Sequence, residues 1–287
     1  MVNNARLFVE LIRKASGDCY PNWAPSRTIT VGDYGVVDEE TGEFERHGSI
    51  YDSAFEPELN IAKLHPPEPC APEDQLVIVS RGCKGKNLDA ELNTLTKDIS
   101  RFPELVKSSI KGRWEFQRGK GAIIVLFKPS ESRIRDKATL FPKLQFNETL
   151  AEKALVTSVY SCPMYALLLT ADKNTKADAA IGLSVANVGT GSLRGRWHCH
   201  STSGVWRSGG EEGNATFHPL YTLRTPKTKG FMDRLLKRRA ETIPSGEATF
   251  HPYQPPWKQL DDDGNEIPEE ESESDEDESD DEAEQPL

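Results

Sequence analysis

The residues best suited to metal binding lie together in the second half of the chain. His198 and His200 flank Cys199, and imidazole and thiolate groups are common ligands of Zn²⁺ in proteins. Residues 192–201 alternate like a β-strand, however, so both histidines point to one face and the thiol points to the other. Ligands on opposite faces cannot converge on one ion. We therefore expect a polar sheet face here and no metal site.

Catalytic motifs are missing from the rest of the sequence. It contains no GxSxG elbow, no HExxH, no Walker loop and no CxxC. Residues 189–195 (GTGSLRG) loosely resemble a dinucleotide-binding loop, but their spacing is wrong and a strand comes next, so a phosphate would meet no helix N-terminus. We predict a protein that is not an enzyme and uses no cofactor. An active site built from distant segments is the alternative.

The distribution of charge gives the clearest functional signal. The whole chain carries 46 acidic and 35 basic residues, a formal net charge of −11. Residues 261–287 contain 16 of the acids and no Lys or Arg, which leaves residues 1–260 with 30 acids, 35 bases and a net charge of +5. A basic body with an acidic C-terminal tail predicts an anionic ligand with which the tail competes, either lipid head groups or nucleic acid.

A strongly basic segment joins the body to the tail. Residues 224–239 (RTPKTKGFMDRLLKRR) hold seven bases, with Asp233 as the only acid. A basic run of this kind is typical of nucleic-acid binding or nuclear import. The neighbouring acidic tail would repel phosphate, so we expect no nucleic-acid partner.

An amphipathic helix is predicted at the N-terminus. Asn3 or Asn4 would cap it and Gly17 would end it. Apolar residues recur at helical spacing at Leu7, Phe8, Leu11, Ile12 and Ala15. Three bases lie off this stripe, namely Arg6, Arg13 and Lys14. The helix is therefore either docked on the protein core or placed to contact a membrane surface.

The rest of the body is predicted to be mostly β-structure. Strands are expected at 28–37, 43–50, 75–80, 154–170 (kinked at Pro163), 179–187, 192–201 and 216–223, with a hairpin over 109–128. Helical spacing at 88–102 and the polar stretch 129–153 would add helical turns. The predicted fold class is α+β, with an N-terminal amphipathic helix, a twisted and mostly antiparallel sheet, and a disordered acidic C-terminal tail.

Cellular location is indicated by what the sequence lacks. It has no apolar run long enough for a transmembrane helix and no secretory signal. The cysteines are odd in number and scattered, which favours reduced thiols over a disulfide framework. We expect a cytoplasmic protein.

One short sequence occurs twice. Residues 215–219 and residues 248–252 both read ATFHP. The first copy falls in the last predicted strand, and the second lies beyond the basic segment. One hypothesis is that the second copy docks by strand addition on the sheet edge or groove that the first copy uses.

Several segments together resemble the gasdermin family, and most closely its fungal cell-death members. Residues 155–160 (LVTSVY) are similar to the gasdermin segment L-x-V-V-T-E-V, and residues 219–224 (PLYTLR) to L-A-F-R-V. Residues 32–50 (GDYGVVDEETGEFERHGSI) resemble the fungal pattern GD-x-G-x-x-D…G-x-F-x-x-x-G-x-I. The resemblance implies a pore-forming domain over 1–225, a basic tether with a short inhibitory segment over 226–260, and a tail over 261–287. Too few residues come after Leu223 for the large helical C-terminal domain of mammalian members.

The resemblance also implies a function. Proteolytic cleavage would release the body, which would bind anionic phospholipids, associate with other copies of itself and open a β-barrel pore in regulated cell death. Residues 179–187 and 192–201 have nearly the length of membrane-spanning strands, although alternation is equally typical of a half-buried sheet in a soluble protein. Lipid phosphates would be contacted by Arg6, Arg13, Lys14, Arg194 and Arg196.

An activating protease is the second implied partner. Exposed, flexible basic segments are easily nicked, which places the cleavage region in the tether. Its candidate residues are Lys227, Lys229, Phe231, Arg234, Lys237, Arg238 and Arg239. The protein would be cytoplasmic when intact and membrane-bound after activation.

A non-enzymatic binding module is the alternative. In this interpretation the body is a soluble α+β domain, and the acidic tail engages basic partners such as histones or ribosomal proteins. It predicts that removal of residues 261–287 abolishes partner capture and has no effect on membranes.

Overall fold

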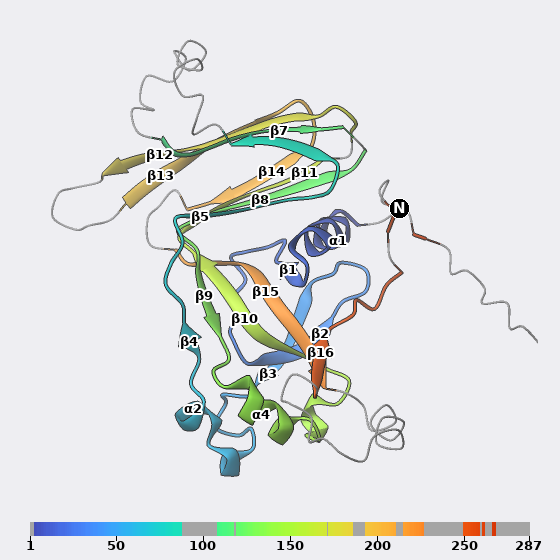
Figure 1. Ribbon diagram of the computed structural model, residues 1–287, viewed down its shortest axis with the longest axis vertical. Helices are drawn as coiled ribbons and strands as arrows, with labels where there is room; N and C mark the ends of the chain where they lie inside the picture. The colour runs from blue at the N-terminus through green and yellow to red at the C-terminus, as the bar shows by residue number, and fades with distance from the viewer. Residues whose placement is uncertain are drawn as a thin grey trace, which may run out of the picture.

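A helix begins the chain, and antiparallel strands make up most of the remaining described residues (Figure 1). The structure is a computed structural model, which describes residues 3–87, 108–117, 119–170, 172–185, 193–210, 215–226, 249–258, 260–261 and 266–267. All pairs between the described strands are antiparallel. The predicted mixed α+β class, with an N-terminal helix and mostly antiparallel sheets, is confirmed.

Helix α1 (Asn4–Ser16) forms where capping and side-chain pattern agree. The side-chain oxygen of Asn3 accepts a hydrogen bond from the backbone N–H of Ala5 at 2.8 Å, which satisfies one of the free donors at the helix start. Gly17 ends the helix with a φ of 90°, a conformation that glycine adopts without strain, and its N–H donates to the carbonyl of Arg13. The predicted ends of the helix are confirmed, with Asn3 as the cap.

Three sheets make up the β-structure. The basal sheet is eight-stranded, and five of its strands follow the order β1 (Cys19–Pro21), β15 (Phe217–Pro226), β10 (Ala154–Cys162), β2 (Asp33–Val37) and β3 (Phe44–Ser49). Strand β16 (Phe250–Pro252) pairs with β15, β9 (Ser130–Arg133) pairs with β10, and β4 (Glu68–Pro69) pairs with β9. The middle sheet has four strands, β14 (Val205–Gly209), β11 (Met164–Thr170), β8 (Gly121–Phe127) and β5 (Gln75–Val79). The outer sheet also has four, β13 (Leu193–Ser201), β12 (Lys176–Val185), β7 (Ser108–Phe116) and β6 (Cys83–Asn87).

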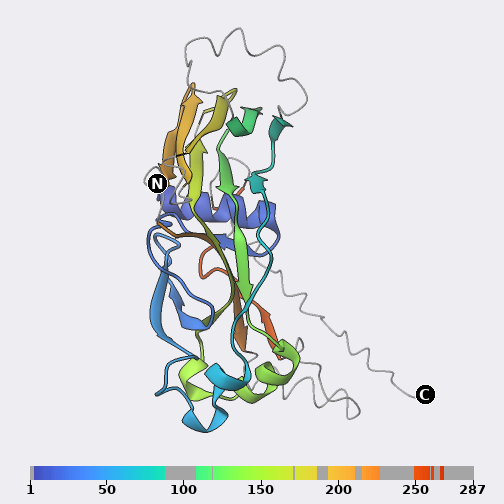
Figure 2. The ribbon, with the colours of Figure 1, turned by 90° about the vertical axis from the view of Figure 1, so that its left-hand side faces the viewer.

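The sheets and α1 are arranged in layers. The outer sheet stacks on the middle sheet, and α1 lies on the opposite side of the middle sheet, next to the basal sheet (Figure 1). Figure 2 shows α1 crossing the molecule between these two halves. Four short helices complete the basal half among the described residues: η1 (Pro57–Leu59), α2 (Ile61–Leu64), α4 (Lys137–Leu144) and η4 (Glu148–Leu150). Helices α2 and α4 lie at the end of the molecule far from the outer sheet (Figure 1).

The two central strands of the middle sheet, β8 and β11, are buried on both faces, which explains the continuous apolar run of β8. Every residue of β8 is buried. Ile124 and Leu126 belong to the cluster that contains Phe8 of α1, whereas Ile123 and Val125 belong to the cluster shared with the outer sheet. Successive side chains of a strand point to opposite faces, so each half of the run fills a different core.

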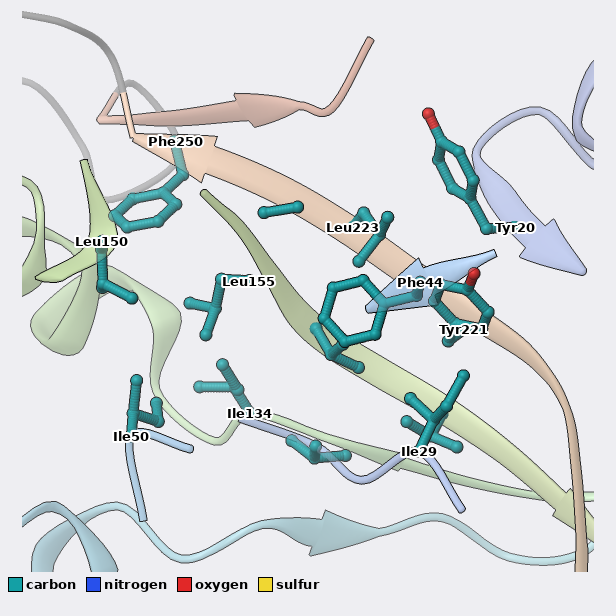
Figure 3. Close-up of a cluster of buried hydrophobic side chains, with 14 of the residues drawn as sticks. Tyr20, Ile29, Phe44, Ile50, Ile134, Leu150, Leu155, Tyr221, Leu223 and Phe250 are labelled. Carbon is teal, nitrogen blue, oxygen red and sulfur yellow. The ribbon is translucent and has the colours of Figure 1, made fainter. Parts of the chain in front are cut away.

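The basal sheet has its own core, which includes a residue from the C-terminal part of the chain. Figure 3 shows Tyr221 and Leu223 of β15 with Phe44 and Leu155 in this cluster. Phe250 of β16 enters the same cluster and is fully buried, and its ring centroid lies 4.4 Å from that of Phe141 in α4. The fold of the body therefore includes residues beyond the basic segment.

The hairpin predicted over residues 109–128 is wrong. Strands β7 and β8 occupy this stretch, but β7 pairs with β6 and β12, while β8 pairs with β5 and β11. The turn between them passes from the outer sheet to the middle sheet, and a Cβ on Gly121 would lie 2.1 Å from the ring of Phe116. Two strands with apolar faces suit a hairpin and a crossing between packed sheets equally well, so the sequence pattern did not separate these cases.

The single strand predicted over 154–170 is two strands. They are β10 and β11, which lie in the basal and middle sheets and meet at Pro163. Proline has no backbone N–H to donate to a neighbouring strand. The chain can therefore leave one sheet and enter the other at Pro163 without losing a hydrogen bond from this residue. Strands β3, β5, β12, β13 and β15 confirm the other predictions within about three residues at each end. Strand β2 ends where it was predicted to end, but it begins at Asp33 and not at residue 28. Helical turns in 129–153 are confirmed by α4 and η4.

Some sequence predictions fall outside the described residues. The helix predicted at 88–102 and nearly all of the tail over 261–287 are among them. The five cysteines are all free. Among the described residues, no helix combines the length and apolar character needed to cross a bilayer.

Candidate functional site

Helix α1 buries its apolar side in the protein interior. Phe8 and Ile12 are fully buried against the middle sheet, and the ring centroid of Phe8 lies 4.8 Å from that of Trp23. Val9 reaches the basal core. In this state α1 is docked on the core, which was one of the two interpretations left open by the sequence.

The three bases of α1 are largely covered. Only 11% of the Arg6 side chain is exposed, 13% of Arg13 and 31% of Lys14. Part of what covers them is the C-terminal cover, which we define as residues 249–258, 260–261 and 266–267. The predicted lipid-binding bases on α1 therefore lie at or beside the contact between this helix and the C-terminal cover.

Arg6 and Lys14 contact the C-terminal cover directly. The guanidinium of Arg6 pairs with the carboxylate of Glu266 at 2.8 Å and lies 5.5 Å from the ring centroid of Trp257. The ammonium of Lys14 donates to the backbone carbonyl of Leu260. Both cations thus have acceptors or a ring face supplied by the cover.

Glu10 connects the bases of α1 to one another. Its side chain is 1% exposed, and its carboxylate lies 3.2 Å from Nε of Arg13 and 3.4 Å from Nζ of Lys14. The indole N–H of Trp257 donates to the same carboxylate at 3.4 Å. A buried carboxylate is stable only when it is paired and hydrogen-bonded, and here one of its three donors comes from the cover.

Three apolar side chains anchor the cover. Phe250, Trp257 and Leu260 are buried, the first two in the basal core and Leu260 in the cluster beneath the middle sheet. Trp257 packs closely against Gly42, where an added Cβ would lie 3.3 Å from the indole ring. The cover is therefore fixed by packing as well as by charge.

Strand addition also holds the cover. Strand β16 pairs with β15, with Arg224 opposite Pro252 and Pro226 opposite Phe250. The backbone N–H of Tyr253 continues the ladder to the carbonyl of Leu223 at 3.1 Å. Strand β1 pairs with residues 220–222 of β15, and β16 pairs with residues 224–226 of the same strand. Strand β10 is the third partner of β15.

The second ATFHP copy thus docks by strand addition, as the hypothesis stated. It pairs at the end of β15, whereas the first copy, residues 215–219, lies at its beginning. The two copies do not share one position on the sheet edge. That part of the hypothesis is wrong, because β16 pairs with residues 224–226.

A basic pocket lies beside the same contact. It is a cavity of about 340 Å³, and its lining includes Arg81 from the turn after β5 and Lys120 from the turn before β8. The remaining lining residues are Glu10, Leu11, Arg13, Lys14, Leu260 and Asp261. Four bases therefore converge where the cover contributes Leu260 and one acid.

Arg81 and Lys120 carry no mark of a binding role in the sequence itself. Each of these bases lies next to a glycine in a tight turn. A turn of this kind indicates that the base is at the surface, but it does not indicate which residues the base faces. Their convergence depends on how the middle sheet stacks on α1, and residue spacing does not contain that information.

The structure divides the predicted lipid-binding residues between two places. Arg194 and Arg196 belong to β13 of the outer sheet, and Arg196 is exposed. They are not part of the contact between α1 and the cover.

The histidine pair also lies on β13. His200 is exposed, whereas Cys199 is half-buried against the cluster between the outer and middle sheets, and burial raises its pKa to about 12. In the part of the chain that the structure describes, no group of three His, Cys, Asp or Glu residues is placed to hold a metal ion.

The predicted cleavage region lies outside the described residues. Its members, Lys227, Lys229, Phe231, Arg234, Lys237, Arg238 and Arg239, fall between β15 and β16. Pro226 and Phe250 are paired across the two strands, so the described chain leaves and returns at one point of the sheet edge.

Comparisons of the chain with protein-family models, with curated protein sequences and with solved structures gave no match in any of the three.

Proposed function

We propose that the protein is an autoinhibited pore-forming protein of regulated cell death, similar in its action to the gasdermins. In this proposal a protease cuts residues 227–239 and the C-terminal cover leaves. The bases of α1 then bind anionic phospholipids, and several copies assemble into a membrane pore. The protein would stay in the cytoplasm while intact and move to the membrane after cleavage.

The observation that carries the proposal is the contact between α1 and the cover. Arg6 and Lys14, two of the bases that the sequence marks for lipid phosphate, are contacted by Glu266, Trp257 and the carbonyl of Leu260. Loss of the cover would leave Arg6 without its carboxylate partner and open the pocket that holds Arg81 and Lys120. Each base near an anionic membrane contributes about 1 kcal/mol of attraction, so this exposed group would favour binding by several kcal/mol.

The outer sheet supports the second step, membrane insertion. One of its faces is apolar and packs on the middle sheet, with Trp114, Phe116, Ala177, Ala179, Ile181 and Trp197 in the shared cluster. Its other face is polar, and there Arg113 pairs with Asp178 at 2.7 Å. Strand β12 has 10 residues, and β7 and β13 have 9 each. A membrane-spanning strand needs about 9–11 residues with one apolar face.

The contact between the outer and middle sheets leaves a polar group unsatisfied. The indole N–H of Trp197 is buried there and has no hydrogen-bond partner among the described residues. A buried N–H without an acceptor costs about 1–3 kcal/mol. This cost weakens the packing of the outer sheet on the middle sheet, and so it lowers the free energy needed to separate the two sheets.

Assembly depends on the edges of the outer sheet. The strand order β13-β12-β7-β6 leaves β13 and β6 at its two edges. An open edge in lipid leaves backbone groups without partners, so inserted strands must close into a ring. We expect β13 of one copy to pair with β6 of the next, a head-to-tail contact that closes when the rotation permits.

Dye release from vesicles tests the proposal. The full chain, carrying a recognition sequence for a site-specific protease within residues 227–239, is added to phosphatidylserine vesicles and to neutral phosphatidylcholine vesicles. We expect release only after cutting and only from the anionic vesicles. The uncut chain is the control.

Charge variants identify the lipid contact. Arg6→Ala with Lys14→Ala should weaken binding of the cut protein to anionic vesicles by about 10–30-fold, since each base contributes about 1 kcal/mol. Lys143→Ala in α4, an exposed base at the far end of the molecule, should have no effect. If cut protein leaves anionic vesicles intact while the acidic tail captures basic proteins, the binding module replaces this proposal.

A further inference from the structure

The exposed face of the outer sheet carries more bases than acids. Arg113, Lys176 and Arg196 are exposed on it, against the acids Glu115 and Asp178. Arg113 and Asp178 pair with each other at 2.7 Å and so largely offset one another. The described side chains alone therefore leave this face with a positive balance.

Strand register adds further bases to the same face. Lys84 lies opposite Glu115 and Lys86 opposite Arg113, while Lys111 lies opposite Ala180 and Arg194 opposite Ser184. Residues directly opposite one another in neighbouring antiparallel strands belong to the same face of the sheet. The strand positions of this face then include two acids, Glu115 and Asp178, and seven bases, Lys84, Lys86, Lys111, Arg113, Lys176, Arg194 and Arg196.

The charges are unevenly spread along the strands. Both acids lie at the end of β7 and the beginning of β12, where Glu115 is opposite Lys176 and Asp178 is opposite Arg113. Beyond Asp178 toward the other end of β12, the paired positions on this face hold no acid. There the register positions are occupied by Lys111, Ala180, His198, Gly182, Arg196, Ser184 and Arg194.

We infer that the pore conducts anions in preference to cations, and this inference rests on the proposed function. In lipid, the apolar face with Trp114 and Trp197 must turn to the hydrocarbon, which leaves the basic face to line the water-filled lumen. Every copy in a ring repeats the same rows, so each basic row becomes a ring of positive charge. Rings of Lys and Arg attract anions and repel cations, which sets the selectivity of a pore. Arg194 and Arg196 then act on the permeating ion instead of on lipid head groups.

Ion selectivity in a planar bilayer tests the inference. The full chain with the protease site described above is cut after addition to a phosphatidylserine bilayer, and the reversal potential is measured under about a tenfold KCl gradient. We expect a chloride-to-potassium permeability ratio above 1. The reversal potential does not depend on the number of open pores, so a variant that opens fewer pores still reports its selectivity.

Variants on the basic face show whether it sets the ratio. Arg196→Glu with Lys111→Glu should lower the chloride-to-potassium ratio at least about twofold, because both positions lie where the face has no acid. Arg135→Glu, an exposed base outside the outer sheet, should leave the ratio unchanged. A ratio of 1 or below in the wild-type pore, or a ratio that the double variant does not alter, would overturn the inference and leave the proposed function standing. Absence of both conductance and dye release would overturn both.

Discussion

The indole N–H of Trp257 donates to the carboxylate of Glu10 across 3.4 Å, and this bond joins the C-terminal cover to the N-terminal helix. Glu10 is also the carboxylate that pairs with Arg13 and Lys14. A single buried acid thus links the bases of α1 to the residue that anchors the C-terminal cover. Any change that removes Trp257 should therefore alter the exposure of the bases.

Trp257→Ala should release the cover without proteolysis. Truncating a buried Trp typically costs about 3–5 kcal/mol, and here it also removes the ring that Arg6 contacts. We expect a lower midpoint of urea unfolding and leakage of anionic vesicles by the uncut chain. Ile267→Ala, at a residue of the cover that is 45% exposed, should change neither. An uncut Trp257→Ala protein with normal stability that leaves vesicles intact would show that the cover does not depend on this anchor.

Glu10→Gln should separate charge from hydrogen bonding. Glutamine still accepts from Trp257, but Arg13 and Lys14 lose their shared ionic partner, so we expect the free energy of unfolding to fall by about 1–3 kcal/mol. Trp257→Phe keeps the ring and removes the donor instead. Urea unfolding of both single variants and of the double variant measures their coupling.

The coupling free energy between the two substitutions reports on the hydrogen bond between Glu10 and Trp257. A coupling of about 0.5 kcal/mol or more is expected for residues in direct contact. Strictly additive effects would mean that the negative charge of Glu10 adds nothing to its hydrogen bond with Trp257.

Sequence reasoning succeeded where the cause is local. Asn3 and Gly17 set the ends of α1 through their own side chain and backbone freedom. The alternation around Cys199 placed its thiol against the core, because strand geometry determines which way each side chain points. The same rule located β12 and β13.

Sequence reasoning failed where contacts join distant segments. Glu10 and Trp257 are separated by 247 positions, and no periodicity marks either as a partner of the other. The division of residues 154–170 at Pro163 needed knowledge of which sheet each strand joins. The ATFHP repeat was a partial exception, since it pointed to strand addition, but its register with Arg224–Pro226 depends on the docked position of the cover.

Three cysteine thiols that pack against the sheet cores should report movement of the outer sheet. Burial raises the pKa of Cys83 to about 11 and that of Cys199 to about 12, and both side chains pack in the cluster between the outer and middle sheets. Cys162 is buried in the other cluster, with its pKa raised to about 12 by the same cause. At pH 8 all three should react slowly with thiol reagents, because the thiolate is the reactive form.

Pore formation should change which of these three thiols can be labelled. If the outer sheet leaves the middle sheet, Cys83 and Cys199 should be labelled by a lipid-soluble photoreactive probe, which needs no thiolate, in the membrane-bound, cut protein, while Cys162 stays protected. Mass spectrometry of the labelled peptides measures this, with the uncut chain as the control. Equal protection of all three thiols in leaking vesicles would contradict insertion of the outer sheet.

Alkaline pH should act on the same groups. The folded chain keeps these thiols protonated to a higher pH than the unfolded chain, whose thiols have their ordinary pKa near 9. Unfolding therefore releases protons above about pH 9, so the free energy of unfolding should fall between about pH 9 and 12 and be unaffected by these groups at pH 7. Urea unfolding at several pH values, compared with a Cys162→Ala variant, should show a shallower decline for the variant.

Cleavage by itself should not free the cover. Pro226 and Phe250 are paired at the sheet edge on either side of the predicted cleavage region. Phe250, Trp257 and Leu260 are buried, and a cut within residues 227–239 breaks no bond in residues 249–261, so we expect these side chains to stay buried. Burying each of these side chains contributes about 1.5–3 kcal/mol, so the cut fragment should remain bound at high protein concentration. Gel filtration of the cut chain should show one complex that separates on dilution or on addition of anionic vesicles.

Phe250→Ala, which removes the contact with Phe141, should weaken retention of the fragment by about 100-fold or more, given the 3–5 kcal/mol typical of buried Phe→Ala changes. Immediate separation of the wild-type fragment at high concentration would show that the covalent link, and not the packing of the cover, keeps the bases of α1 from the membrane.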